Sequence, residues 1–530
     1  MAGTVLRDAL LAHGVGLAGT CDGGGTCGRC RVTLSPAPPL TPSERLHLSD
    51  RDTARGVRLA CRVTVTTDLH VTLDAPASAG WRALDLPTHD RLRPRLARAR
   101  RGQSLRRATT RDASALAVAV DLGTTHVRVS LWDLWQGRRL AAQIGPNPQA
   151  MFGVDVLSRL ARAAASPADA ARMADAVVAA LGEAIRDLCL AAGHDVSAIE
   201  RVVIVGNTAM LALLTRHNTD ALLDPAQWTQ AIDCTPRDPD GWRRAWRLSP
   251  AADILVVPPL AGFVGSDLVA AVLATHLCAS RDPAVLIDFG TNTEVACWDG
   301  DTLHTTSAAG GPAFEGSGVG CGMPAERGAI VRVERATTPP RHLRIDVLGG
   351  GEPLGVSGSG LVDAIACFID AGQLTPAGRF TDPRRGAPLV IAAGASGRDI
   401  ALSKRDIDVF QRAKAAIGAA TRLLLDEAGL REVDVQRLCV CGAFGEHLAS
   451  AHARSIGLLP SVADARIELH GHAALSGAER LLEPGRPVRD LGDIRARARV
   501  LNLATAPRYE DAFIAHLALR PAATEEIVGC

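Results

Sequence analysis

The feature that most constrains the fold is a motif that occurs twice, far apart in the chain. In each copy an apolar, β-prone run ends in Asp-x-Gly-Thr, at residues 117–125 and again at residues 285–292. A buried strand that stops at a carboxylate can hold a hydrated Mg²⁺, while the glycine permits a tight turn and the next N–H and hydroxyl groups can cradle phosphate. One copy alone is a weak signal, because many strand-turn sequences look like this. Two copies predict a duplicated α/β lobe with a nucleotide between the halves.

Further glycine-rich turns follow in the second half of the chain. Residues 357–360 open a helix whose first N–H groups suit a phosphate, although a tight turn with close packing explains them equally well. Residues 442–445 end a strand, and such a turn can lie beneath adenine and ribose. The candidate catalytic residues are Asp121 and Asp288, and the candidate nucleotide contacts are Gly123, Thr124, Thr125, Gly290, Thr291, Asn292, Gly358, Ser359, Gly360, Gly442 and Gly445.

Helices and strands alternate through the rest of this region, as in α/β lobes. A helix is predicted from Ser166, a capping residue, to the stop at Gly193. A strand at 202–206 ends in the turn 206–208, to which the sequence assigns no role. A long helix is predicted at 404–427, and Lys414 on it could reach a phosphate, although a solvated lysine is the preferred interpretation.

Four cysteines near the N-terminus predict a metal centre. Cys21, Cys27 and Cys30 lie close together around a glycine-rich loop, and Cys61 follows at a distance. Three close thiolates and one distant thiolate are typical of the plant-type [2Fe–2S] arrangement, here with five residues in the first gap instead of four. A zinc site or unligated cysteines are the alternatives.

The segment around these cysteines predicts a short helix at 4–13 and strands at 31–34 and 62–66. A β-grasp ferredoxin normally has a β-hairpin before its helix, whereas this chain starts at the helix. Either the true start lies upstream, or the domain lacks two strands and leaves a sheet edge unfilled.

Composition narrows the class of protein. The 530 residues are 47% apolar and carry a net charge of +1, so neither nucleic acid nor another polyanion is an expected partner. No apolar run reaches the length of a membrane span and no signal-peptide pattern is present, so we expect a cytoplasmic protein. The 13 cysteines then argue for metal or redox chemistry instead of disulfides.

The sequence divides into three parts. Residues 1–75 are predicted to form the [2Fe–2S] domain, and residues 115–530 the two-lobed domain. The segment 76–114 between them is rich in arginine and interrupted by prolines, so it predicts a solvated linker that lets the cluster domain move. A docking strip for an acidic partner is the alternative.

Together these motifs resemble the reductive activators of corrinoid proteins, which are ferredoxin-fused ATPases of the acetate kinase, sugar kinase, heat-shock and actin class. The resemblance covers nearly the whole chain, and the fusion of the two halves identifies the family where neither half would. It implies a multi-domain α/β protein with a β-grasp ferredoxin-like domain and a two-lobed actin-like ATPase. The motifs that carry it are the four cysteines, residues 121–125, 147–149, 206–208, 288–292, 310–316, 357–360 and 442–445.

The resemblance implies ATP-dependent one-electron reduction of Co(II) to Co(I) in the corrinoid protein of a methyltransferase system. It also implies a [2Fe–2S] cluster, ATP and Mg²⁺ as cofactors, and an electron donor, and it leaves a homodimer open. Three other functions remain open: an ATP-gated electron donor to a different metalloenzyme, a small-molecule kinase with a regulatory cluster, and a redox sensor. A kinase would need a catalytic base in its cleft, for which the sequence offers no clear candidate.

Overall fold

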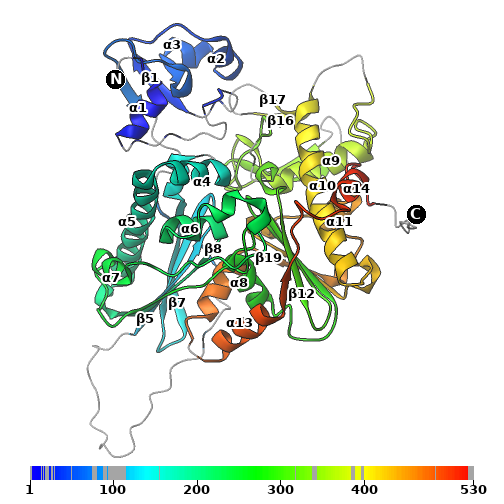
Figure 1. The fold of residues 1–530 in the computed structure, drawn as a ribbon. Helices are drawn as coiled ribbons and strands as arrows, with labels where there is room; N and C mark the ends of the chain where they lie inside the picture. The colour runs from blue at the N-terminus through cyan, green and yellow to red at the C-terminus, as the bar shows by residue number, and fades with distance from the viewer. Residues whose placement is uncertain are drawn as a thin grey trace, which may run out of the picture.

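The computed structural model shows an N-terminal domain and a two-lobed body (Figure 1). No helix in the described part of the chain is long and apolar enough to cross a membrane. The structure describes residues 3–13, 15, 17, 23–25, 28, 30–48, 50–73, 80–86, 92, 115–153, 155–314, 316, 318–336, 343–382, 388–394, 399–483 and 485–522.

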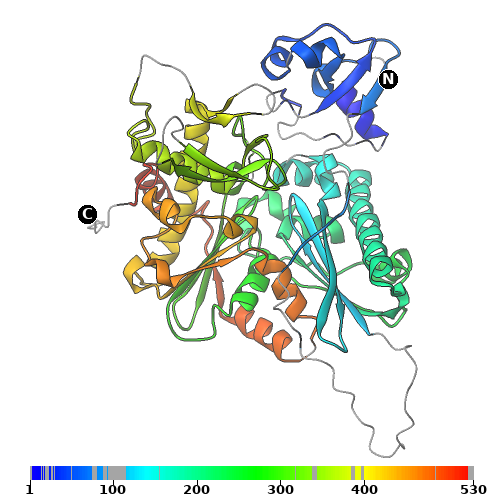
Figure 2. The same ribbon diagram turned by 180° about the vertical axis from the view of Figure 1, so that it is seen from behind.

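Two six-stranded sheets form the centres of the lobes, and they lie side by side in the view of Figure 2. The first has the order β4-β7-β6-β5-β8-β9 and the second β19-β18-β10-β11-β12-β20. The first consists of β4 (Arg82–Ala83), β5 (Leu116–Leu122), β6 (His126–Asp133), β7 (Arg138–Pro146), β8 (Ile199–Gly206) and β9 (Asp253–Val256). The second consists of β10 (Ala284–Phe289), β11 (Thr293–Trp298), β12 (Leu303–Ala308), β18 (Arg437–Cys441), β19 (Ile467–His470) and β20 (Ala498–Val500).

The two sheets repeat one topology, which confirms the predicted duplication. In each, the strand that carries Asp-x-Gly-Thr pairs antiparallel with the strand that follows it and parallel with a strand from much later in the lobe. The next pairings, β6 with β7 and β11 with β12, are both antiparallel. The edges differ, because β4 joins β7 antiparallel whereas β20 joins β12 parallel.

Helices cover the outer faces of the sheets and fill the space between the lobes. The central strand β5 is buried along its whole length, as its continuous apolar run predicts. The helices are α4 (Val156–Ala165), α5 (Pro167–Ala192), α6 (Thr208–Thr215), α7 (Pro239–Trp246), α8 (Ser266–Thr275), α9 (Gly358–Asp370), α10 (Lys404–Glu427), α11 (Ser450–Ser455), α12 (Ala473–Arg480), α13 (Arg486–Arg497) and α14 (Tyr509–Ala515). A small sheet of β13 (Ala329–Arg335), β14 (Leu343–Val347) and β15 (Gly355–Val356), and the hairpin of β16 (Leu389–Ala393) and β17 (Asp399–Leu402), extend the second lobe.

The helix ends follow the local sequence signals. Ser166 caps α5 by accepting the Asp169 N–H, and Gly193 ends this helix in the left-handed region with φ of 73°. Ser403 and Asp406 form a capping box at the start of α10. The structure confirms these predictions. Caps can be predicted from the sequence because they depend on residues only a few positions apart.

The prediction of a solvated Lys414 is wrong. Its side chain is buried, and its ammonium group donates to the carbonyl oxygens of His516 at 2.8 Å, Ala518 at 2.5 Å and Arg520 at 3.4 Å. The C-terminal segment crosses α10 and supplies one acceptor for each ammonium proton. Lys414 therefore fastens this segment to the second lobe and does not line the cavity described below.

The N-terminal domain contains α1 (Leu6–Ala12), α2 (Pro42–His47), α3 (Asp50–Ala54) and a sheet of β2 (Val57–Leu59), β1 (Arg31–Ser35) and β3 (His70–Leu73). The strand predicted at 62–66 is not formed. Instead, that segment meets the start of the chain at a single isolated antiparallel bridge, between Thr64 and Val5. A 3₁₀ turn at Ala60–Arg62 comes first and directs Cys61 into the domain core.

Part of the segment predicted as a linker is incorporated into the first lobe. Strand β4 pairs with β7, Trp81 packs against the lobe core, and buried Leu92 donates its N–H to Gly137 O at 3.0 Å. Only residues 74–79 separate Leu73, the end of β3, from this attached stretch. The N-terminal domain is thus tethered over a maximum span of roughly 25 Å.

The lobes meet where α8 crosses α12. A Cβ added at Gly477 of α12 would collide with the carbonyl oxygen of Ala270 on α8. Nearby, Arg139 of β7 forms a bidentate ion pair with buried Glu479 of α12, at 2.7 and 2.5 Å. This close crossing and the ion pair fix α12 against the first lobe.

Replacement of Gly477 by valine is expected to lower the Tm by roughly 2–12 °C, because overpacking costs about 1–3 kcal/mol and each kcal/mol shifts the Tm by about 2–4 °C. The matched control is Gly492→Val on α13, where an added Cβ meets nothing within 4 Å. Differential scanning calorimetry of both variants checks this. Equal melting temperatures would show that the α8–α12 crossing tolerates separation.

Candidate nucleotide and iron–sulfur sites

The two Asp-x-Gly-Thr turns face each other across the boundary between the lobes. Thr125 Oγ1 and Thr291 Oγ1 are hydrogen-bonded at 2.8 Å. Each turn is closed by its own glycine, with Gly123 N donating to His126 O and Gly290 N donating to Asn292 O, both at 3.1 Å. The duplicated motif therefore forms two matching loops that meet at one point.

A cavity of about 670 Å³ lies at this meeting point. Most of the predicted site residues line it, whereas Gly358, Ser359, Gly360 and Gly445 do not. Ser359 instead donates to Val331 O at 2.9 Å, so this glycine turn packs α9 against β13. The predicted residues that line the cavity are Asp121, Gly123, Thr124, Thr125, Asp288, Gly290, Thr291, Asn292 and Gly442.

Four carboxylates face this cavity: Asp121, Asp267, Asp288 and Glu294. Burial, together with the charge of Asp121, raises the pKa of Asp288 to about 7. Burial and the charges of Asp121 and Asp288 raise the pKa of Asp267 to about 8, and burial raises that of Glu294 well above its usual range. Clustered carboxylate oxygens are the ligands that Mg²⁺ prefers, so the residues present fit this ion.

Asp267 and Glu294 are the site residues that sequence reasoning missed. Glu294 lies two positions after Asn292 at the start of the return strand β11, so the strand period places it on the same side as the phosphate loop. Asp267 lies in the first turn of α8, two positions after Gly265, the N-cap residue of that helix. An acid just after a phosphate loop and an acid in the first turn of a helix are sequence signals that could have predicted both site residues.

One cation balances part of this negative charge. Among the described residues that line the cavity, Arg128 carries the only arginine or lysine side chain. Its Nη1 donates to Asp121 Oδ2 at 2.9 Å, because Arg128 on β6 lies directly opposite Asp121 on β5. Its buried Nε has no partner. The guanidinium group thus keeps one donor that no described residue accepts.

Residues outside the cavity hold the first phosphate loop in shape. Asn147 Nδ2 donates to Gly123 O at 2.8 Å, and buried Arg159 donates to Thr124 O at 2.7 Å. The turn 206–208, which had no assigned role, places Asn207 in the cavity lining. The polar motif around Asn147 is therefore a support for the loop.

The cysteine site is described in part. Cys30 and Cys61 are buried side by side, and the Cys61 hydrogen bond lowers the pKa of Cys30 to about 6. Gly23, Gly25 and Gly28 have positive φ, the backbone conformation that lets a loop fold over a cluster. Two adjacent thiols, one with a lowered pKa, fit iron ligation. Cys21 and Cys27, the other predicted ligands, lie outside the described residues.

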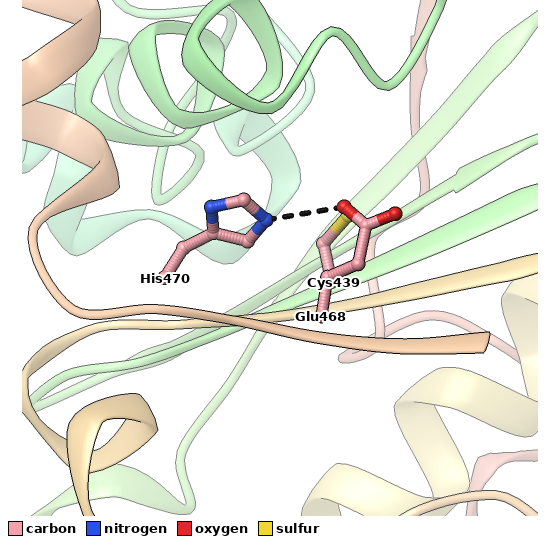
Figure 3. A group of neighbouring side chains, drawn as sticks. All are labelled: Cys439, Glu468 and His470. Atoms are coloured by element: carbon pink, nitrogen blue, oxygen red, sulfur yellow. Dashed lines mark hydrogen bonds and ion pairs between the residues drawn. The ribbon is translucent and has the colours of Figure 1, made fainter. Parts of the chain in front are cut away.

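A second group of potential metal ligands lies in the second lobe, where Cys439, Glu468 and His470 approach one another (Figure 3). Arg437 already occupies the carboxylate of Glu468 with two hydrogen bonds of 2.8 Å. Burial raises the pKa of Cys439 to about 12, so its thiol keeps its proton. The group is thus satisfied as a packed ion-pair cluster beneath α8.

These features define a class: a [2Fe–2S] ferredoxin-like domain joined to a two-lobed, actin-like ATPase. Family models match three regions of the chain. The C-terminal domain of RACo, described as the ASKHA domain, matches residues 282–528, the RACo middle region matches residues 116–280, and a 2Fe-2S iron-sulfur cluster binding domain matches residues 1–66.

Individual proteins agree with the family match. The chain is 30% identical over 419 residues to the corrinoid activation enzyme RamQ of Eubacterium limosum, covering 75% of this chain and 69% of that one. It is 27% identical over 432 residues to a Co(II) methylated amine-specific corrinoid protein reductase of Methanosarcina barkeri, with 76% of each covered. A solved reductive activator for corrinoid, iron-sulfur protein matches with a TM-score of 0.67 and 26% identity, over 98% of this chain and 96% of that one. The chain belongs to the family of reductive activators of corrinoid proteins.

The raised carboxyl pKa values predict a pH-dependent stability. In EDTA the Tm should fall as pH rises from 6 to 8, because Asp267 and Asp288 keep protons in the folded state that the unfolded chain has lost above about pH 4. Between pH 6 and pH 8 the free energy of unfolding should fall by an amount on the order of 1–3 kcal/mol. Asp267→Asn should flatten the slope in a fluorimetric melt, and Asp346→Asn on β14 should not; identical slopes in all three proteins would contradict the assignment.

If Cys61 is a cluster ligand, as its position predicts, its loss should abolish cluster assembly. Cys61→Ser is expected to remove the visible absorption of the [2Fe–2S] centre and the bound iron, because oxygen replaces a thiolate at a buried ligand position. Cys367→Ser, an equally buried cysteine of α9, is the matched control and should retain both. Anaerobic reconstitution followed by absorption spectroscopy and iron analysis measures the difference. A normal spectrum for the Cys61 variant would assign the fourth ligand elsewhere.

Proposed function

We propose that this chain uses Mg-ATP bound between Asp121 and Asp288 to drive the one-electron reduction of Co(II) to Co(I) in a corrinoid protein. The observation that carries the proposal is the presence, in one chain, of a ferredoxin-type cysteine site and an interlobe cavity lined by two phosphate loops. Neither part alone would call for both an electron and a nucleotide.

The energetics explain why the two parts belong together. A plant-type cluster has a potential near −400 mV, and Co(I) formation is more demanding. For a one-electron step, each ~59 mV of deficit lowers the equilibrium constant tenfold. When bound, the cluster supplies one electron at a time and Mg-ATP supplies the free energy that shifts this equilibrium. The chain's own residues must therefore couple nucleotide binding to the way the corrinoid protein is held.

Asp121 and Asp288 are the residues that would hold the ion, one from each lobe. Gly123 to Thr125 and Gly290 to Asn292 would receive the phosphates through N–H and hydroxyl groups. In the structure Thr125 and Thr291 bond to each other at 2.8 Å. Phosphate between the loops must replace this bond, so nucleotide binding changes the contact between the lobes.

Arg128 has a second role in this scheme. While no cation is present, it neutralises Asp121 through the 2.9 Å ion pair. If a divalent ion took over that role, the guanidinium group of Arg128 would be free to donate to phosphoryl oxygens, which suit its several donors. Arg128 would thus stabilise the negative charge that develops when the terminal phosphoryl group leaves.

Asp267 and Glu294 can orient the water that attacks the phosphoryl group. Both line the cavity without belonging to either phosphate loop, and Asp267 has a pKa near 8, close to the range in which a general base works. Sequence reasoning found no base in the cleft, and the structure supplies these two carboxylates. ATP hydrolysis is therefore within the chemical capacity of the site.

The remaining partners follow from the same scheme. A reduced protein or small reductant must recharge the cluster after each transfer. None of the ten cysteines in the described part of the chain forms a disulfide, which is consistent with the reducing conditions of the cytoplasm, where we place the protein. An assay of ATP-dependent electron transfer to other metalloenzymes would reveal an ATP-gated donor to a different acceptor. Gel filtration would show whether the chain is a homodimer.

Asp288→Asn should abolish ATP-dependent activation while leaving the cluster spectrum intact, because it removes a carboxylate from the ion site in the second lobe. The test is anaerobic: the chemically reduced protein is mixed with a Co(II) corrinoid protein, and the Co(I) absorption band is followed with and without Mg-ATP. Asp301→Asn, in an exposed turn, should behave as the wild type. Unchanged Co(I) formation by the Asp288 variant would remove it from the ATP site.

A further inference from the structure

A second cavity, which we call the apolar cavity, lies between the lobes next to the nucleotide cavity and encloses about 720 Å³. One wall comes from the first lobe, at the start of α4 and the loops before α8. The opposite wall comes from the second lobe, at the end of β12 and the segment after β20. The lining residues are Val156, Leu157, Trp228, Phe263, Val264, Asn292, Thr306 to Ala309 and Val500 to Ala504.

The chemistry of this cavity excludes charged ligands. None of its described lining residues is an acid, a base or a histidine. Trp228 and Phe263 stack edge to face at 4.8 Å and form an aromatic wall. Leu157 at the rim is 54% exposed, so the apolar surface continues beyond the cavity. A phosphorylated acceptor would find no ionic partner here.

Two contacts connect the apolar cavity to the nucleotide cavity. Asn292, at the end of the second phosphate loop, lines both. Ser307 lines the apolar cavity and donates to Glu294, a nucleotide-cavity carboxylate, at 3.4 Å. Asn502 also donates to Pro225 O at 2.9 Å across the lobes. An occupant of the apolar cavity would therefore contact the same elements that change when the nucleotide binds.

The position of the cavity favours a protein as its occupant. Its rim is formed by the first turn of α4, the helix that lies beside the N-terminal domain in both views (Figures 1 and 2). A protein docked there would stand within reach of the cluster domain, whose tether from Leu73 to Gly80 spans roughly 25 Å at most. The half-exposed Leu157 at the rim gives such a partner an apolar surface that continues from the cavity lining.

We infer that the apolar cavity receives one or two large apolar side chains of the corrinoid protein, so that partner binding is coupled to the nucleotide state. This inference rests on the proposed function. Because the cavity walls belong to different lobes, a change in lobe closure alters the cavity shape. An occupant that fits one closure better must shift the nucleotide equilibrium, and by linkage the nucleotide shifts the affinity for the occupant equally.

The test compares two exposed leucines. Leu157→Asp puts a charge at the cavity rim, and Leu190→Asp does the same on α5, where the leucine is 81% exposed and outside the cavity. With Mg-AMPPNP present, Leu157→Asp should weaken binding of a Co(II) corrinoid protein at least tenfold in calorimetry, while Leu190→Asp should stay within twofold of wild type. Ala309→Trp, which fills the cavity mouth from an exposed position, should give the same loss.

The outcomes separate the inference from the function on which it rests. Circular dichroism and the cluster spectrum verify that each variant is folded. Equal affinities for the two aspartate variants, with Co(I) formation intact, overturn the docking site and leave the proposed function standing. If no corrinoid protein binds the wild type, both fail. Binding of the neutral dye N-phenyl-1-naphthylamine that the corrinoid protein does not displace also overturns the inference, since the cavity would then take a small molecule.

Discussion

The structure depends on the mutual repulsion of carboxylates at the boundary between the lobes. Asp121 and Asp288 end equivalent strands of two sheets with the same topology, and Asp267 and Glu294 face the same cavity. Burial makes each ionised form costly, and every further negative charge adds to that cost. Arg128 offsets only one of them. A divalent cation carrying a nucleotide is thus the occupant that changes the electrostatics of this boundary most.

In the proposed scheme, the same boundary links nucleotide binding to recognition of the partner protein. The lobes are fixed at the α8–α12 crossing and at the Arg139–Glu479 ion pair, while the phosphate loops touch through two threonine hydroxyls. Movement is therefore expected at the loops and not at the crossing. The apolar cavity shares Asn292 with the second phosphate loop, and the short tether limits how far the cluster domain can move from the first lobe. In the proposed scheme, electron delivery, nucleotide binding and partner docking would then take place close to one another.

Much of this was readable in the sequence, because the signals are local. The duplicated strand-turn motif predicted two matching lobes, and the caps at Ser166 and Ser403 marked where long helices begin. Cysteine spacing predicted the iron–sulfur domain, and the family match agrees. Each of these signals depends on the geometry of a few neighbouring residues, which survives whatever the rest of the chain does.

What the sequence by itself determined was the presence of two phosphate loops, a cysteine cluster and the elements that carry them. Only the tertiary structure decided that Asp267 and Glu294 join the nucleotide cavity, that Lys414 is buried under the C-terminal segment, and that β4 draws part of the predicted linker into a sheet. These facts depend on which distant segments meet. A lysine or an acid carries no local mark of the carbonyl or carboxylate that another part of the chain will bring to it.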